Sequence, residues 1–127
     1  GEQAINATVL TGGTIENCYG TITVSGGGSL DLINVSLTIN GLGSSNSINA
    51  VDSWLTFGTA ATLHSIQLSS GSLTGHALPL ISNSIIENCD IRTSINTTGI
   101  KLVVRNSYIN AKITTRNIEL INNQIYA

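Results

Sequence analysis

The chain has 127 residues, a formal net charge of −2 at pH 7 and only 9% charged side chains. Because it holds only five Lys and Arg residues and no basic patch, a nucleic-acid partner is not expected. No apolar run has the length of a membrane span. The length suits one domain over residues 1–127. Since the chain begins with Gly1-Glu2 and lacks Met, we expect it to be a fragment of a longer protein.

A short motif recurs along the whole chain. The sequence "IENC" at residues 15–18 returns at 86–89, and each copy has an Asn with an apolar residue two positions before it. With this Asn as the anchor, equivalent positions recur at intervals of 17, 18, 18, 18, 18 and 16 residues. The seven anchors are Asn17, Asn34, Asp52, Ser70, Asn88, Asn106 and Asn122. A fixed period of this size indicates a solenoid, whose units bury their apolar side chains only by stacking.

Apolar residues alternate on both sides of each anchor. In chain order, the alternation predicts pairs of short strands at 30–32 and 37–39, at 48–50 and 55–57, and at 102–104 and 109–113. A period of two is typical of strands, and the apolar spacing of a long amphipathic helix does not occur. Clusters rich in Gly, Asn and Ser punctuate the strands, for example at 25–29, 40–47 and 96–99.

The anchor itself is expected to be a bend. The apolar positions step from two residues before the anchor to three after it, so the chain must turn a corner there, in a left-handed conformation. Gly tolerates this conformation best, and Asn and Asp come next. Ser70 is therefore the anchor that fits least well. Successive anchors should stack ~4.8 Å apart. We expect their buried amides to hydrogen-bond to one another as an Asn ladder.

The recurring bend, as in "IENCDI", "VRNSYI" and "INNQI", resembles that of the right-handed parallel β-helix of the pectate-lyase-like superfamily, which includes many bacteriophage tailspikes. The resemblance runs from about Ile5 to Tyr126. It implies an all-β fold: a single-stranded right-handed parallel β-helix of about seven short coils. The left-handed hexapeptide β-helix also has coils of about 18 residues, but the uneven step at the anchor breaks its six-residue register, so it ranks second.

The two cysteines are expected to be free thiols. Cys18 and Cys89 each follow an anchor, and they lie four coils apart. Stacking separates them by ~19 Å, well beyond the Cα separation of ~7 Å that a disulfide allows. His64 and His76 belong to different coils, and no His clusters with the cysteines. No metal site and no other cofactor is therefore expected.

A catalytic site on this fold would need paired carboxylates on one face. Glu16 and Asp31 are the best pair, on neighbouring strands roughly 8 Å apart. Solvated surface is the more common explanation for such a pair, so the sequence favours a protein that is not an enzyme. Glu87 and Arg105 share one position on adjacent coils, which predicts a surface ion pair.

Three outward columns point to binding. Tyr19, Trp54 and Tyr108 stand two residues after their anchors, where exposed rings can stack on sugars, and they are the predicted saccharide contacts. Four Thr residues stand four after the anchor, an array that ice-binding β-helices display: Thr21, Thr38, Thr56 and Thr74. An apolar file lies before the anchors and would mark an interface: Ile33, Val51, Ile85, Val103 and Ile121.

The resemblance and these columns together lead to a functional hypothesis. We expect a structural and receptor-contact segment of a phage tailspike or tail fibre, located in the virion and thus extracellular. Its partners would be two further copies in a homotrimer and a host cell-surface polysaccharide. The first alternative is a fragment of a polysaccharide lyase or glycoside hydrolase, and a lesser one is an ice-binding β-helix. One such fold hosts many activities, so the fold does not choose among them.

Overall fold

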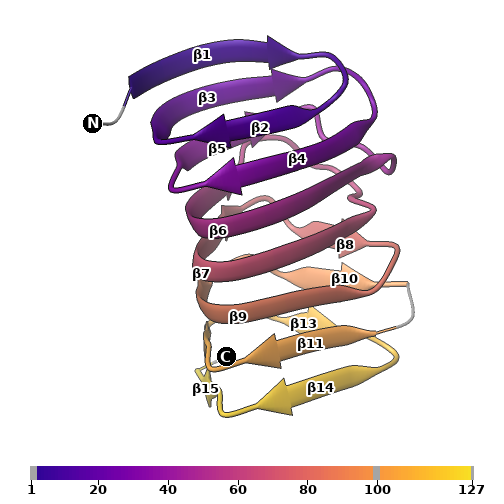
Figure 1. The fold of residues 1–127 in the computed structure, drawn as a ribbon. Helices are drawn as coiled ribbons and strands as arrows, with labels where there is room; N and C mark the ends of the chain where they lie inside the picture. The colour runs from indigo at the N-terminus through magenta and orange to yellow at the C-terminus, as the bar shows by residue number, and fades with distance from the viewer. Residues whose placement is uncertain (1–2, 99–100, 127) are drawn as a thin grey trace.

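A computed structural model describes residues 3–98 and 101–126 (Figure 1). All of its regular elements are β-strands, and neighbouring strands pair in parallel. They stack as a solenoid of about seven turns, which confirms the expected fold class. Each turn contributes one strand before its anchor and one after it, because apolar residues alternate on both sides of the bend.

The strands before the anchors form what we call the pre-bend sheet. From the first coil to the last they are β2 (Gly13–Glu16), β4 (Gly28–Ile33), the first parts of β6 (Asn46–Phe57), β7 (Ser65–Gly75) and β9 (Ser84–Ile91), then β11 (Leu102–Arg105) and β14 (Ile118–Ile121). This sheet carries the predicted apolar file on its outer face.

The strands after the anchors form the post-bend sheet. They are β3 (Cys18–Val24), β5 (Ser36–Asn40), the later parts of β6, β7 and β9, then β12 (Tyr108–Ile109) and β15 (Gln124–Ile125). The strand β1 (Gln3–Val9) precedes the first anchor and joins the same sheet by pairing with β3. A smaller third sheet closes the later coils and consists of β8 (Leu78–Leu80), β10 (Ile95–Thr97) and β13 (Ile113–Thr114). Because β6, β7 and β9 run through their bends unbroken, the first two sheets form one continuous surface.

The solenoid is right-handed, as the sequence pattern predicted. In Figure 1 the pre-bend strands β4, β11 and β14 point to the left on the near side, and β8, β10 and β13 return to the right behind them while the chain descends. Viewed from the N-terminal end, the chain thus runs clockwise as it moves away. The left-handed alternative is wrong.

Inward side chains stack in columns along the axis. Leu30, Ile48 and Ile66 are in register on successive pre-bend strands, and none is more than 1% exposed. Leu37, Leu55 and Leu73 form the equivalent column after the bend. Each such side chain gains about 1.5–3 kcal/mol from burial. The core is therefore a set of apolar columns, one for each inward position of the repeat.

All seven anchors adopt the left-handed conformation, with φ between 50° and 71°. Ser70, the one that fitted least well, has the largest of these angles. The expectation of buried amides is wrong, however. Six anchor side chains are exposed and Ser70 is half-buried, because the corner residue points away from the core. Asn34 Nδ2 donates to Asn17 Oδ1 at 2.9 Å on this outer side.

The residue after each anchor forms an inner ladder instead. These positions hold Cys18, Val35, Ser53, Gly71, Cys89, Ser107 and Asn123. Ser53 Oγ donates to the Val51 carbonyl at 2.9 Å, and Ser107 Oγ donates to the Arg105 carbonyl at 2.8 Å. Ser107 Oγ also accepts the Cys89 amide at 3.1 Å. Small polar side chains therefore hydrogen-bond to the backbone amide and carbonyl groups on the inner side of the bend.

Candidate binding surfaces beside the bend

Both cysteines belong to the inner ladder and are free thiols. Cys89 is 4% exposed, and its Sγ donates to the Glu87 carbonyl at 3.0 Å. Burial raises the pKa of the Cys89 thiol to about 12. A protonated, enclosed thiol is a poor nucleophile, so Cys89 acts as a ladder side chain comparable with Ser53 and Ser107.

The two candidate carboxylates lie on the outer face of the pre-bend sheet. Glu16 pairs in register with Ile33, and Asp31 pairs with Thr14, so Glu16 and Asp31 are diagonal neighbours. Both are exposed, and Asn49 Nδ2 donates to Asp31 Oδ1 at 3.4 Å. Asp31 lines the hollow described below, whereas Glu16 does not. The structure thus places the pair on open surface, where water has free access to both groups.

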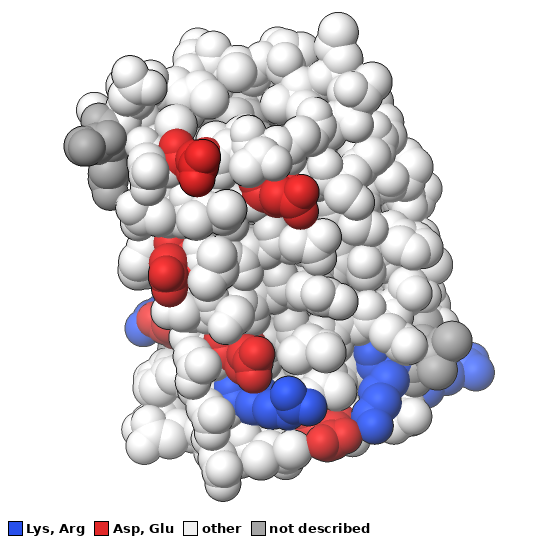
Figure 2. All heavy atoms as spheres, viewed as in Figure 1, with Lys and Arg blue, Asp and Glu red and all other residues white. Residues whose placement is uncertain are grey.

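Charges are unevenly distributed along the solenoid. Figure 2 shows acidic side chains over the upper and middle coils and the cations at the lower end. Among the described residues three ion pairs form there: Arg92–Asp90 at 3.1 Å, Lys101–Glu119 at 3.0 Å and Arg105–Glu87 at 3.7 Å. The predicted pair of Glu87 and Arg105 is confirmed. The hydrogen bond and charge of Lys101 lower the pKa of Glu119.

A hollow of about 520 Å³ lies on the outer face of the pre-bend sheet, over the first five coils. One side is a polar row of Thr14, Asp31, Asn49 and Gln67. The other side carries Ile33 and Val51, each 39% exposed, and continues in register with Ser69 and Glu87. The hollow therefore has hydrogen-bonding groups on both sides, and its exposed apolar side chains are those of Ile33 and Val51.

Val103 does not belong to the exposed part of the apolar file. It pairs in register with Ile85 and Glu119 and is only 8% exposed. Its neighbours along its own strand, toward Lys101 and Arg105, take part in the ion pairs of the lower coils. The apolar file predicted from the sequence is thus exposed at Ile33 and Val51 and buried at Val103, because long charged side chains surround Val103.

The outer face of the post-bend sheet is a regular array. Thr21, Thr38, Thr56 and Thr74 are in register on four successive strands, as the period predicted. The Thr56 and Thr74 hydroxyls lie 3.0 Å apart. In the adjacent column, Tyr19 is 47% exposed and Trp54 is 50% exposed, with Ser36 between them. These two rings therefore project from the sheet into solvent.

Tyr108 has different surroundings from the other two aromatic candidates. Its ring stacks on Tyr126, with 4.5 Å between centroids and 23° between planes. The Arg92 guanidinium lies over Tyr108 at 5.8 Å from the centroid, and Arg92 Nε donates to both carboxylate oxygens of Asp90. The structure brings these groups together at the lower end of the post-bend sheet. Tyr126 is 60% exposed and was not among the sequence candidates, although its place in the repeat put it diagonally beside Tyr108.

Comparison of the chain with protein-family models, with curated proteins and with solved structures finds no match in any of the three. The described residues include no helix long and apolar enough to cross a membrane. Within the same residues, no three His, Cys, Asp or Glu side chains lie close enough together to hold a metal ion. The fold thus defines a parallel β-solenoid, while the likeness to the pectate-lyase-like superfamily and to phage tailspikes stays a resemblance of sequence pattern.

Proposed function

We propose that this chain is a rigid structural segment of an extracellular fibre of the phage tailspike kind, which assembles as a homotrimer in the virion. Its post-bend sheet contacts a polysaccharide of the host cell surface. The chain itself carries out no chemistry in this role. Its contribution is a stiff surface whose polar groups and rings are already in place before the glycan arrives.

The observation that carries this proposal is the outer face of the post-bend sheet. It combines a row of in-register Thr hydroxyls with the stacked pair of Tyr108 and Tyr126 beside Arg92. Sugars have hydroxyl edges that exchange hydrogen bonds and C–H faces that pack on aromatic rings. Because both strands and side chains are held by their neighbours, little conformational entropy is lost on binding.

Isothermal titration of the chain with purified bacterial surface polysaccharides tests the proposal. Binding should be seen for at least one polymer, and Tyr126→Ala should weaken it roughly tenfold. Asn96→Ala, an exposed change on the third sheet, is the control and should leave the affinity unchanged. A panel without any binding polymer, or an equal loss in both variants, would contradict glycan contact. Depolymerisation of the bound polymer, abolished by Asp31→Asn, would instead indicate the enzyme alternative.

The in-register Thr row also supports a second candidate, ice binding. A flat array of equally spaced hydroxyls is what such a surface requires, and four successive coils provide one. In the adjacent column, the exposed rings of Tyr19 and Trp54 project from the sheet, so the surface beside the Thr row is not flat. Thermal hysteresis of the purified chain that disappears in Thr38→Leu or Thr56→Leu would favour this candidate over glycan contact.

A further inference from the structure

The outer face of the pre-bend sheet has a charge pattern that the glycan proposal does not use. Residues 3–91 contain five Asp and Glu side chains and no Lys or Arg, whereas all five Lys and Arg of the chain lie between residues 92 and 116. Figure 2 shows this face, with acidic side chains over the upper and middle coils and cations over the lower ones. The 520 Å³ hollow over the first five coils therefore lies in the acidic part of the solenoid.

Three carboxylates beside the hollow form no ion pair with the described residues. Asp31 lines the hollow, Glu16 is in register with Ile33 of its wall, and Asp52 follows Val51 at the bend. All three carboxylates are exposed, and the ion pairs within the described residues involve other acids. A surface that carries one sign of charge around a concave site attracts ligands of the opposite sign. The hollow thus favours a cationic ligand.

The walls of the hollow provide two further kinds of contact. Ile33 and Val51 are each 39% exposed, so a ligand can cover their aliphatic side chains. On the other side, Asn49 and Gln67 are exposed and in register, and each side-chain amide can donate and accept hydrogen bonds. Asn49 Nδ2 already donates to Asp31 Oδ1 at 3.4 Å, which leaves its carbonyl oxygen for a ligand. A matching ligand therefore combines cationic, aliphatic and amide groups.

We propose that this hollow binds an extended segment of a partner protein that carries Lys or Arg side chains. The aliphatic stem of such a side chain packs on Ile33 and Val51 while its charged head reaches the carboxylates. The peptide groups of the segment hydrogen-bond with Asn49 and Gln67. The site goes beyond the proposed function, since it lies on the other sheet from the glycan contact.

The lining of the hollow favours a peptide over other cationic ligands. A polyamine has no carbonyl groups to accept hydrogen bonds from side-chain amides. A sugar ring packs its C–H face on aromatic rings, and the described residues that line the hollow include no aromatic side chain. A basic peptide uses the carboxylates, the amides and the aliphatic side chains together.

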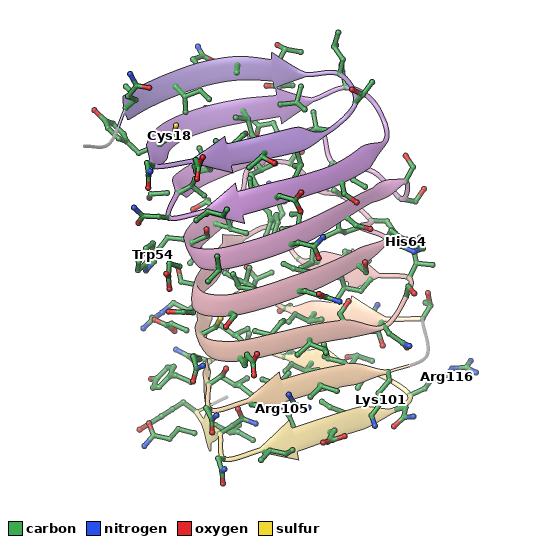
Figure 3. All side chains as sticks on the ribbon, viewed as in Figure 1. Cys18, Trp54, His64, Lys101, Arg105 and Arg116 are labelled. Carbon is green, nitrogen blue, oxygen red and sulfur yellow. The ribbon has the colours of Figure 1, made fainter. Side chains whose placement is uncertain are left out.

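The size of the hollow sets the length of the segment. Five residues in register on successive strands mark its extent: Thr14, Asp31, Asn49, Gln67 and Ile85. Four steps of ~4.8 Å span roughly 19 Å, and an extended chain rises ~3.3 Å per residue, so about six residues cross the hollow. Figure 3 shows Lys101 and Arg105 on the same face at the lower coils, where they repel a cation and bound the site.

Fluorescence anisotropy of a labelled hexapeptide in which Lys and Ser alternate tests the site at low ionic strength. The peptide should bind, and the same peptide with Glu in place of Lys should not. Asp31→Asn keeps the shape of the side chain and removes one charge, so it should weaken binding roughly threefold to fivefold. Glu119→Gln is the matched control. It makes the same change in net charge on the same sheet, two coils below the hollow, and should leave the affinity unchanged.

Val51→Lys provides an independent readout, because its own stem and ammonium group occupy the hollow and repel a basic ligand. It should weaken peptide binding roughly tenfold and keep the β-sheet circular dichroism of the parent. A lack of peptide binding, or equal losses in Asp31→Asn and Glu119→Gln, would overturn the site. Spermidine that binds as tightly as the peptide would overturn a peptide ligand.

The glycan proposal and the peptide site can fail separately. A polysaccharide that binds to the chain should do so with the same affinity in the presence of saturating hexapeptide, because the two surfaces lie on different sheets. Peptide binding without any polysaccharide binding would support this site and contradict the glycan contact. Competition between the two ligands would overturn the assignment of the peptide to the pre-bend hollow.

Discussion

At each bend, one residue turns outward and the next turns inward. The anchor takes a left-handed φ and places its side chain in solvent, so Asn, Asp and even Ser70 are accepted there. The residue after it must be small or able to hydrogen-bond to the backbone, as Ser53, Cys89 and Ser107 do. The anchor is therefore limited by its backbone conformation, whereas the inward position is limited by the space inside the corner, where the seven bends place Cys, Val, Ser, Gly or Asn.

Gly71 shows the strictest case. A Cβ at this position would lie 1.7 Å from the Ser53 carbonyl oxygen, and its φ is 146°. We expect Gly71→Ala to destabilise the fold by about 2 kcal/mol or more, because the backbone must shift to remove the clash. Urea unfolding followed by circular dichroism measures it. Gly43→Ala is the matched control, since its Cβ would meet only Asn46 Oδ1 at 3.8 Å. Equal effects of the two substitutions would refute the steric explanation.

Cys89 gives a prediction about pH. Its pKa is raised from 9.0 to about 12 by burial in the folded protein. The unfolded chain therefore loses this proton first, so the contribution of the thiol to stability is complete below pH 9 and is lost as pH rises from 9 towards 12. Cys89→Ser should remove this part of the alkaline decline in the free energy of unfolding.

The measurement compares urea unfolding of parent and Cys89→Ser chains at pH 7 and pH 10. At pH 7 the two should differ by less than about 1.5 kcal/mol, because Ser already occupies equivalent ladder positions. When pH rises from 7 to 10, only the parent should lose the part of its free energy of unfolding that the protonated Cys89 thiol contributes. Parallel declines in both chains would show that the Cys89 thiol binds its proton equally in the folded and unfolded states. That result would refute the raised pKa in the folded protein.

At the scale of the strand, stability comes from columns and not from single contacts. Ile66 of β7 lies between Ile48 of β6 and the Ser84 hydroxyl of β9, which accepts its backbone amide at 3.0 Å. An inward residue of a middle strand thus contributes to two interfaces between coils. An outward residue of the same strand, such as Gln67, contributes to neither of these interfaces.

We expect Ile66→Ala to lower the free energy of unfolding by about 2–5 kcal/mol, since Ile66 is fully buried and its column would contain a cavity. Gln67→Ala, one residue away on the outer face, should change it by less than about 0.5 kcal/mol. Thermal and urea denaturation of both variants give the comparison. Similar losses would mean that β7 is not oriented as described.

At the scale of the whole molecule, the coils differ in how firmly they are held. β6 and β7 are long strands with inward residues that are mostly buried. In the last coil, β13 and β15 each contain two residues, and the inward residues Ile118 and Leu120 of β14 are 38% and 43% exposed. Stability in a stacked solenoid depends on neighbouring coils, so it should fall toward β14.

Amide hydrogen exchange tests this gradient. We expect amides of residues 113–125 to exchange at least tenfold faster than those of β6 and β7, because local opening of the last coil exposes little additional apolar surface. Mass spectrometry of peptic peptides resolves the two regions. Equal protection in both would show that the chain opens only as a single unit.

The sequence by itself determined the period, the seven bends, the parallel stacking and the pairing of Glu87 with Arg105. These follow from local spacing, since a step between apolar positions forces a corner and a fixed period forces equivalent residues into register. The same reasoning placed the anchor amides inside, because spacing marks the corner without showing which of its two residues faces the core.

Only the tertiary structure decided that Asn34 points outward while Ser53 and Cys89 point inward, that charged neighbours close over Val103, and that Tyr126 covers Tyr108. Each of these depends on side chains from different coils meeting in space. Their reach and direction are set by the twist and curvature of the stacked sheets, which a one-dimensional repeat does not encode.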